Sequence, residues 1–464
     1  MRASMPAGWA AQGGRHNRPM PTRLPPTALV PALVPALMLA LMLALLGGCT
    51  APIPRPAPVP QAAPIVSPAP LPPRAAELPA PAAAPPFDAN APAGFHAWLR
   101  EFAEQARAQG TDQATLDATL ARARWRPDVL ALDRAQPEFT RTPWAYLDSA
   151  VSPARVQQGR AMRARYHAPL QAAAERYGVP GEIIAAIWGM ESNYGQFFGD
   201  IPTVDALATL AFDGRRRHWA EHELLAALAI VQQGDIAAGK LRGSWAGAMG
   251  HTQFLPSVFL RYAVDADGDG RRDIWASVAD ATASTAHFLA QAGWRAHEPW
   301  GAEVLLPAGF DWRLAEPGVR RDSAAWAALG LRRIDAAALP ALADASLLAP
   351  AGAQGPVLLA GANFRVLLRY NRSDNYALAV GLLAQQIAGG PGLRSAWPRE
   401  EPAISHTEAA ALQQALNARG LDAGAVDGVL GPATRAALRR LQQALGLAPD
   451  GFASDALLRL LSIR

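Results

Sequence analysis

The sequence predicts a mainly α-helical protein of the α+β class, followed by a small separate C-terminal domain of three helices. Apolar residues recur every three or four positions in segments such as residues 95–109 and 224–233, which is the period of an amphipathic helix. Only short segments, for example residues 301–307 and 364–368, favour irregular or β structure. At 464 residues, 50% of them hydrophobic and 18% charged, the chain is long enough for two or three domains with buried cores.

Residues 1–48 have the composition of a lipoprotein signal peptide. They contain four arginines and no Asp, Glu or Lys, and residues 36–46 form an unbroken apolar run that is short for a membrane span. The ending Leu46-Gly47-Gly48-Cys49 resembles a bacterial lipobox, so Cys49, the single cysteine, is predicted to carry a lipid. A membrane-anchor helix with an incidental cysteine is the alternative. Because the stretch before the apolar run is long, Met20 is an alternative start to Met1.

The distribution of charge argues against a nucleic-acid partner. The formal net charge is +4, and four arginines lie within the first 48 residues, so the remaining chain has a net charge of 0. Without a basic excess, nothing favours phosphate binding. The run of three arginines at residues 215–217 is interpreted as a solvated helix face.

Composition divides the rest of the chain into four parts. Residues 49–93 are rich in proline and alanine and are predicted to form an extended tether. Residues 94–396 form the large helical domain, and residues 397–403 (WPREEPA) a linker. Residues 404–464 contain a near repeat, LQQAL at 412–416 and again at 441–445, with Asp-Gly turns and a proline at a helix start, which predicts three short helices.

The segment most informative for chemistry is residues 177–195, YGVPGEIIAAIWGMESNYG. One predicted helix face carries residues spaced i, i+3, i+4 and i+7, namely Ile184, Ile187, Trp188 and Glu191. Glu191 therefore occupies a position expected to be buried, near the negative end of the helix dipole. Both effects raise the pKa of a carboxyl group, as a general acid near neutral pH requires. A carboxylate that reaches solvent or pairs with an arginine is the alternative.

Two further segments carry groups suited to a sugar. Residues 240–259, KLRGSWAGAMGHTQFLPSVF, combine small residues that allow close backbone approach with neutral hydrogen-bonding side chains, among them Ser244 and Gln253. Residues 370–376 add aromatic and amide groups at Tyr370, Asn371 and Tyr376. A tight helix crossing explains the first segment equally well, and a polar helix start explains the second.

A third pattern matches the first half of a calcium-binding EF-hand loop. It begins at Asp265 and reads DADGDGRRDIWA. The predicted ligands are the carboxylates of Asp265, Asp267, Asp269 and Asp273 and the backbone carbonyl of Arg271. The twelfth position is Ala276 where a bidentate Glu is usual, so an Asp/Gly-rich turn without an ion is the alternative. The nine histidines show no zinc spacing.

Five motifs together resemble the lytic murein transglycosylase B family, in that family's order and over residues 95–395. They are PDVLALDRAQPEF, IWGMESNYG, SWAGAMGHTQFLPS, DADGDGRRDIW and RYNRSDNYALAV. The C-terminal VDGVLGPATRAALRRLQ resembles the small peptidoglycan-binding domain of wall-associated enzymes.

This resemblance implies a lysozyme-like catalytic fold. It also implies cleavage of the MurNAc–GlcNAc β-1,4 bond without water, which leaves a 1,6-anhydro-MurNAc end and requires no cofactor. Glu191 matches the family's single catalytic Glu. The family's glycan contacts match Ser244, Gln253, Tyr370, Asn371 and Tyr376, and by a looser alignment Tyr146. The family also implies that Asp280 supplies the late ligand of an enlarged loop holding a structural Ca²⁺.

A single carboxyl suits a transglycosylase, whereas a hydrolytic glycosidase normally needs two. The alternatives are a hydrolytic muramidase acting on the same bond and a non-catalytic wall-anchoring lipoprotein. The expected partners are peptidoglycan glycan strands and, through Cys49, a membrane. Because Thr50 replaces the Asp associated with inner-membrane retention, the predicted location is the outer membrane of a Gram-negative bacterium, facing the periplasm.

Overall fold

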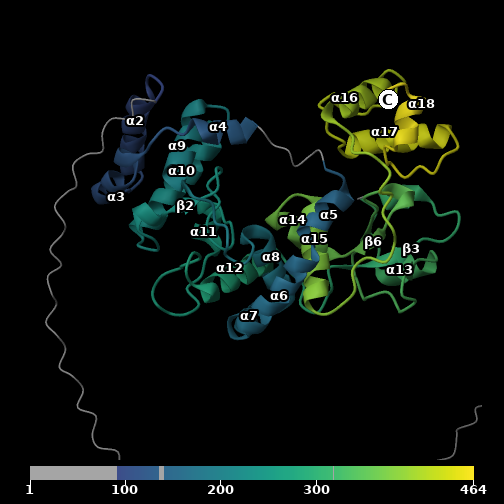
Figure 1. Cartoon of the computed structure of the whole chain (residues 1–464), viewed down its shortest axis with the longest axis horizontal. Coiled ribbons are helices and arrows are strands. Elements are labelled where there is room, and N and C mark those ends of the chain that lie inside the picture. Colours follow the sequence, from purple (N-terminus) through teal and green to yellow (C-terminus); the bar gives the residue numbers. More distant parts are fainter. Residues whose placement is uncertain (1–90, 135–140, 317) are drawn as a thin grey trace, which may run out of the picture. The chain divides into compact units, whose positions relative to one another are not determined.

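A computed structural model describes residues 91–134, 141–316 and 318–464 (Figure 1). The chain divides into two units, residues 1–80 and 81–464, and the described residues all belong to the second. The predicted signal peptide, the lipidation site Cys49 and nearly all of the tether therefore lie outside the described residues. Within the described ranges, no helix is both long enough and apolar enough to cross a membrane.

One group of helices surrounds a core that includes Phe95, Phe102, Leu224 and Phe259. The group consists of α2 (Phe95–Ala108), α3 (Gln113–Ala118), α4 (Pro127–Arg134), α9 (Thr203–Asp213), α10 (Arg217–Gln232) and α11 (Pro256–Tyr262), with short 3₁₀ turns at Leu120–Arg122 and Ala238–Lys240. The predicted helices at 95–109 and 224–233 correspond to α2 and to the second half of α10.

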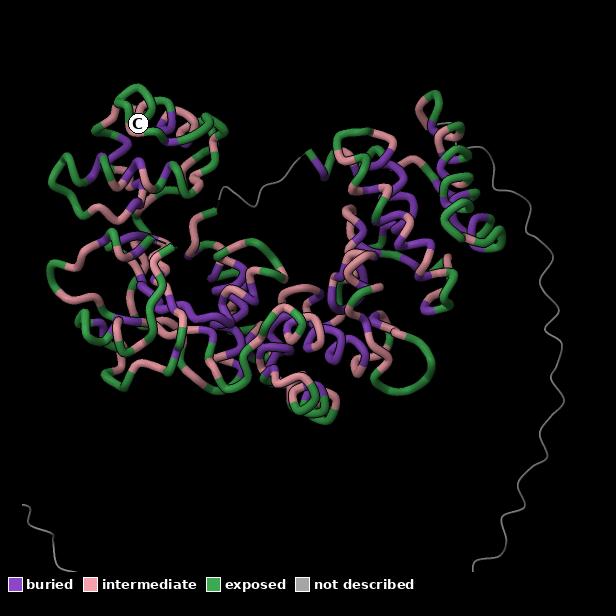
Figure 2. Tube along the Cα trace, turned by 180° about the vertical axis from the view of Figure 1, so that it is seen from behind, coloured by how far each residue is buried: buried purple, intermediate pink, exposed green. Residues whose placement is uncertain are grey.

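A second group of helices encloses the largest core, in which α8 is central. Its members are α5 (Pro143–Ala150), α6 (Pro153–Arg165), α7 (His167–Tyr177), α8 (Gly181–Ser192), α12 (Val278–Gln291), α14 (Ala362–Tyr370) and α15 (Asp374–Ile387). Seven consecutive residues of α8, 183–189, are buried. Figure 2 shows buried residues along the packed helices and exposed residues in many of the connecting loops. The prediction of irregular or β structure at residues 364–368 was wrong, because this segment lies within α14 with its apolar side in the core.

The β structure is a small antiparallel sheet with strand order β4-β3-β6-β5. The strands are β3 (Gly301–Leu305), β4 (Arg332–Arg333), β5 (Ser346–Leu348) and β6 (Val357–Ala360). Val304 pairs with Val357, and the core beside the sheet contains the fully buried Trp326 of α13 (Ser323–Ala328). The predicted strand at 301–307 corresponds to β3. A two-residue ladder joins β1 (Ile201–Pro202) to β2 (Arg242–Gly243).

The C-terminal domain contains the three predicted helices, α16 (His406–Asn417), α17 (Pro432–Ala444) and α18 (Asp455–Leu460), around a leucine-rich core. Ser405 and Glu408 form a capping box at the start of α16, and Pro432 is the first residue of α17. The mainly α-helical class with a three-helix C-terminal domain is thereby confirmed.

The arginine run at 215–217 is more than a solvated helix face. Arg215 and Arg216 both contact the carboxylate of Asp133, whose side chain is only 2% exposed. Burial of an unpaired carboxylate is costly, so these arginines stabilise the end of α4.

Candidate functional site

The backbone leaves the helical conformation at Asn193, two residues after Glu191, and α8 ends there. Asn193 and Tyr194 have φ values of 48° and 58°, so the helix cannot continue. The Tyr194 ring lies between α8 and α6, where a Cβ on Gly189 or Gly159 would come within 2.5 or 2.4 Å of its hydroxyl oxygen. Two glycines thus make room for one tyrosine, and Glu191 sits half-buried in the last helical turn.

Two tyrosines from distant segments lie against Glu191. The Tyr376 hydroxyl donates a hydrogen bond to Oε1 of Glu191, and the Tyr376 ring stacks on Tyr370 at 6.5 Å between centroids. Burial, and then the negative charge of Glu191, raise the pKa of both tyrosines, so both remain protonated donors. Tyr146 on α5 also interacts electrostatically with Tyr376 and so belongs to the same cluster.

Residues 244–255 lie between β2 and α11 and are not helical, so the alternative of a tight helix crossing through this segment is wrong. Ser244 Oγ accepts the backbone N–H groups of Ala246 and Ala248 at 3.3 and 3.1 Å. Gln253, at φ 49°, donates from Nε2 to the carbonyl of Phe198 at 3.1 Å and thereby holds the chain that follows α8. The loop reaches the tyrosine pair through the Tyr370 hydroxyl, which donates to the Thr252 carbonyl at 2.7 Å.

Asn371 is exposed at the C-terminal end of α14, one residue from Tyr370. Ser373 caps α15 by accepting the N–H of Tyr376, so the segment is both a polar helix start and part of the cluster. The structure thus connects Tyr376 to Glu191 directly and Tyr370 through its stacking on Tyr376, whereas Ser244 and Asn371 lie on the segments that adjoin this cluster.

His251 is a supporting residue whose role the sequence did not reveal. Trp188 Nε1 donates to His251 Nδ1 at 2.8 Å, and Ser192 Oγ donates to the His251 carbonyl at 3.0 Å. Burial lowers the His251 pKa to about 4, although the charge of Asp273 opposes the shift. The imidazole is therefore neutral at pH 7 and accepts the indole proton, which fixes the glycine-rich loop to the helix that carries Glu191.

Three of the predicted metal ligands converge. Carboxylate oxygens of Asp265, Asp267 and Asp280 lie within 4.8 Å of one another, and within the described ranges none of the three forms an ion pair with a cation. Asp280 is fully buried and accepts backbone N–H groups from three residues of the loop. This hard-oxygen donor set fits Ca²⁺.

Asp269 and Asp273 are not part of this carboxylate group. Asp269 accepts the Arg271 N–H at 2.8 Å, and Asp273 accepts the N–H groups of Trp275 and Ala276 at 2.9 and 2.8 Å. The loop adjoins the site, because the His251 N–H donates to the Ile274 carbonyl at 2.9 Å.

Two family models match the sequence. The transglycosylase SLT domain covers residues 94–385, and a peptidoglycan binding domain covers residues 405–461. Among curated proteins, the chain is similar to the membrane-bound lytic murein transglycosylase B of Escherichia coli (strain K12). The two are 34% identical over 295 residues, which are 60% of this chain and 79% of that protein.

The fold is also similar to solved structures. SltB3 from Pseudomonas aeruginosa, in complexes with NAG-anhNAM-pentapeptide and with NAG-NAM-pentapeptide, superposes with a TM-score of 0.77 at 48% identity over 79% of this chain and 99% of that chain. The Escherichia coli lytic transglycosylase Slt35 in complex with calcium gives a TM-score of 0.54 at 31% identity, over 62% of this chain and 92% of that chain.

Proposed function

Since this chain belongs to the transglycosylase SLT domain family and is a lytic transglycosylase of peptidoglycan, we propose that Glu191 is its catalytic acid and base. The enzyme cleaves the MurNAc–GlcNAc bond without water and leaves a 1,6-anhydro-MurNAc end. The contact between the Tyr376 hydroxyl and Glu191 Oε1 carries the assignment, because it holds the carboxyl group at the end of α8 beside the buried tyrosine pair.

A single carboxyl can serve both halves of the reaction. Protonated Glu191 gives its proton to the glycosidic oxygen as the bond from that oxygen to MurNAc C1 breaks. The resulting carboxylate then takes the proton from the MurNAc C6 hydroxyl as that oxygen bonds to C1. The carboxyl ends the cycle protonated, and no water is consumed.

The surrounding residues are assigned to glycan binding. Their groups are neutral hydrogen-bond partners and aromatic rings, which suit a saccharide. The assigned contacts are Ser244, Gln253, Tyr370, Asn371, Tyr376 and Tyr146. Gln253 uses both amide hydrogens within the protein, toward Phe198 and Gly250, so its carbonyl oxygen is the atom assigned to a sugar hydroxyl.

The experiment is Glu191→Gln, with Glu182→Gln on the same helix as its matched control. Gln keeps the shape of the side chain but cannot donate and recover a proton, so release of soluble fragments from purified sacculi should cease while binding and the melting temperature are retained. Glu182 pairs with Arg163 at the other end of α8, and its loss should leave activity unchanged. A folded Glu191→Gln protein with full activity would refute the assignment.

For the carboxylate group of Asp265, Asp267 and Asp280, the proposal is a structural Ca²⁺ with no part in the chemistry. When bound, the ion neutralises three clustered negative charges. It also stabilises the conformation of the loop whose Ile274 carbonyl accepts the N–H of His251. Arg271, Asp269 and Asp273 are the remaining candidates of the sequence motif.

The N-terminal assignment remains a proposal from sequence. Residues 1–48 are assigned as a signal peptide, Cys49 as the lipidated residue and residues 49–93 as a tether that lets the enzyme reach the wall from the outer membrane into the periplasm. The boundaries at 94–396, 397–403 and 404–464 complete the proposed organisation.

A further inference from the structure

The C-terminal domain contains two structurally equivalent clamps, one in each half of its sequence repeat. In each, the glutamine at the second position of LQQAL is buried and holds an Asp-Gly turn located four residues before the next helix cap. The first clamp joins Gln413 to Asp427-Gly428, and the second joins Gln442 to Asp450-Gly451.

The hydrogen bonds of the two clamps correspond atom by atom. Gln413 Nε2 donates to Asp427 Oδ1 at 2.8 Å, and Gln442 Nε2 donates to Asp450 Oδ1 at 2.7 Å. Each Oδ1 also accepts the N–H two residues later, at 2.9 Å in both clamps. Both glutamine carbonyls accept the N–H of the turn glycine at 2.8 Å. Oδ1 is therefore used inside each clamp, and Oδ2 points outward.

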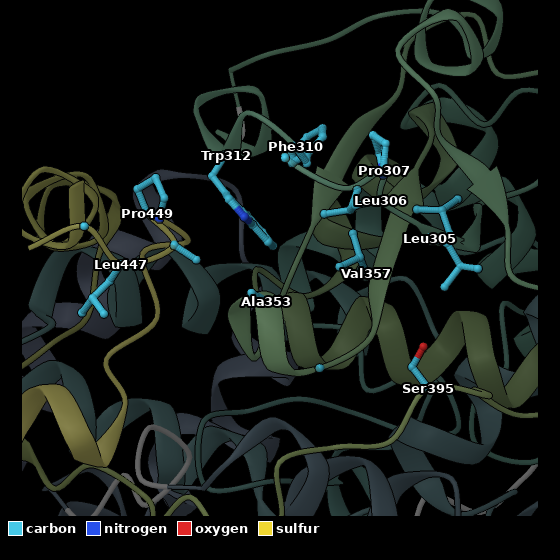
Figure 3. A pocket seen from close by; sticks show the side chains of 15 residues that line it. Leu305, Leu306, Pro307, Phe310, Trp312, Ala353, Val357, Ser395, Leu447 and Pro449 are labelled. Atoms are coloured by element: carbon cyan, nitrogen blue, oxygen red, sulfur yellow. The ribbon is translucent and has the colours of Figure 1, made fainter.

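In the second clamp the outward oxygen binds a peptide backbone. Asp450 Oδ2 accepts the N–H of Ala353 at 2.8 Å. A Cβ on Gly352 would lie 2.3 Å from the same oxygen and 2.7 Å from the Cβ of Phe452, so this contact leaves no room for an L side chain at the residue before the donated amide. A cavity of about 620 Å³ adjoins this contact, with Pro449 on one side and Trp312 projecting toward it (Figure 3).

In the first clamp the equivalent aspartate and its neighbouring side chains are exposed. Asp427 is exposed, and within the described part of the chain its Oδ2 has no hydrogen-bond partner. Val426 and Val429, which correspond to Pro449 and Phe452, are each 45% exposed. The His406 ring covers Gly428, where a Cβ would approach it to 2.6 Å. The clamp bonds and His406 lower the pKa of Asp427, which keeps the carboxylate ionised.

We propose that the Asp427 clamp binds the peptide stem of peptidoglycan, with Asp427 Oδ2 accepting the backbone N–H of an alanine, as Asp450 Oδ2 accepts that of Ala353. The contact that Gly352-Ala353 makes with the equivalent Asp450 clamp in the same chain is the template for this interaction. The proposal rests on the wall-directed function above and specifies that the domain recognises peptide and not glycan.

The test measures retention of the full chain by intact sacculi and by glycan strands stripped of peptide with an amidase. A Glu191→Gln background prevents digestion. Asp427→Asn keeps Oδ1 as an acceptor but replaces the outward oxygen with a donor, so binding to intact sacculi should weaken about tenfold. Asp422→Asn makes the same charge change at an exposed residue of the same domain and should bind as the parent does. Val429→Asp changes only an exposed side chain, keeps the backbone carbonyl that accepts from Gln413, and should weaken binding in the same way.

Two results would overturn the proposal. The first is that Asp427→Asn and Val429→Asp bind intact sacculi as tightly as the parent does. The second is that the two variants lose as much binding to stripped glycan strands as to intact sacculi, which would indicate a contact with glycan. Unchanged melting temperatures establish that the variants are folded. The proposed role of Glu191 is judged separately, by product release in the Glu191-intact protein, where Asp427→Asn should cleave short soluble glycans at the normal rate.

Discussion

Replacing Tyr376 with Phe is the most informative perturbation of the site's geometry. The ring is 4% exposed and stacks on Tyr370, and Phe preserves both features while removing only the hydroxyl that donates to Glu191. A hydrogen bond to an ionised group contributes about 1.5–3 kcal/mol, which corresponds to a rate loss of about 10- to 150-fold if the contact is needed at the transition state. Because the hydroxyl positions the acid, the loss should fall on kcat more than on KM.

Tyr370→Phe is the matched control. It removes a hydrogen bond of 2.7 Å between a hydroxyl and the uncharged Thr252 carbonyl, which contributes about 0.5–1.5 kcal/mol, or a loss of about 2- to 12-fold. The assay is the initial rate of soluble fragment release from purified sacculi, with melting temperatures recorded for both variants. If folded Tyr376→Phe keeps the wild-type rate, or loses less activity than Tyr370→Phe, the role given to the Glu191 contact is wrong.

Three further predictions address the metal, the packing of α8 and the anchor. Chelation should lower the melting temperature and calcium should restore it, because an ion present at 100 times its Kd stabilises the folded state by about 2.7 kcal/mol. If millimolar calcium does not shift the melting temperature, the proposed calcium site is wrong. Gly189→Ala should lower the free energy of unfolding by about 1–3 kcal/mol in denaturant titrations, because the added methyl group overlaps Tyr194. Gly239→Ala is the control, since a Cβ there meets no atom within 4 Å and should lower the free energy of unfolding far less. The Cys49→Ala protein should no longer fractionate with membranes. If this variant still sediments with membranes, the prediction of lipidation is contradicted.

Local periodicity was sufficient to locate α8. Ile184 and Ile187 are fully buried, as their spacing predicts, and Glu191 follows on the same face, two residues before the chain leaves the helical conformation. The turn itself depends on Tyr194 entering a space left by glycines on two helices. That packing is visible only once the helices are placed together.

Contacts between residues far apart in the chain could not be predicted from local sequence patterns. Tyr376 lies 185 positions after Glu191, and the residue pattern around it is equally typical of a polar helix start. The pairing of His251 with Trp188 depends on the burial that keeps the imidazole uncharged, which appears only in the folded structure. The error at residues 364–368 has a similar cause, because an apolar run this short is compatible with a strand or a buried helix.

We expect one carboxyl, that of Glu191, to complete the reaction without water. Digestion of purified sacculi in ¹⁸O-labelled water, followed by mass spectrometry of the released muropeptides, tests it most directly. The expected products have 1,6-anhydro ends, are one water lighter than hydrolysis products and carry no ¹⁸O at the cleaved bond. Reducing ends that carry ¹⁸O would show that water attacks the sugar, and would contradict the mechanism.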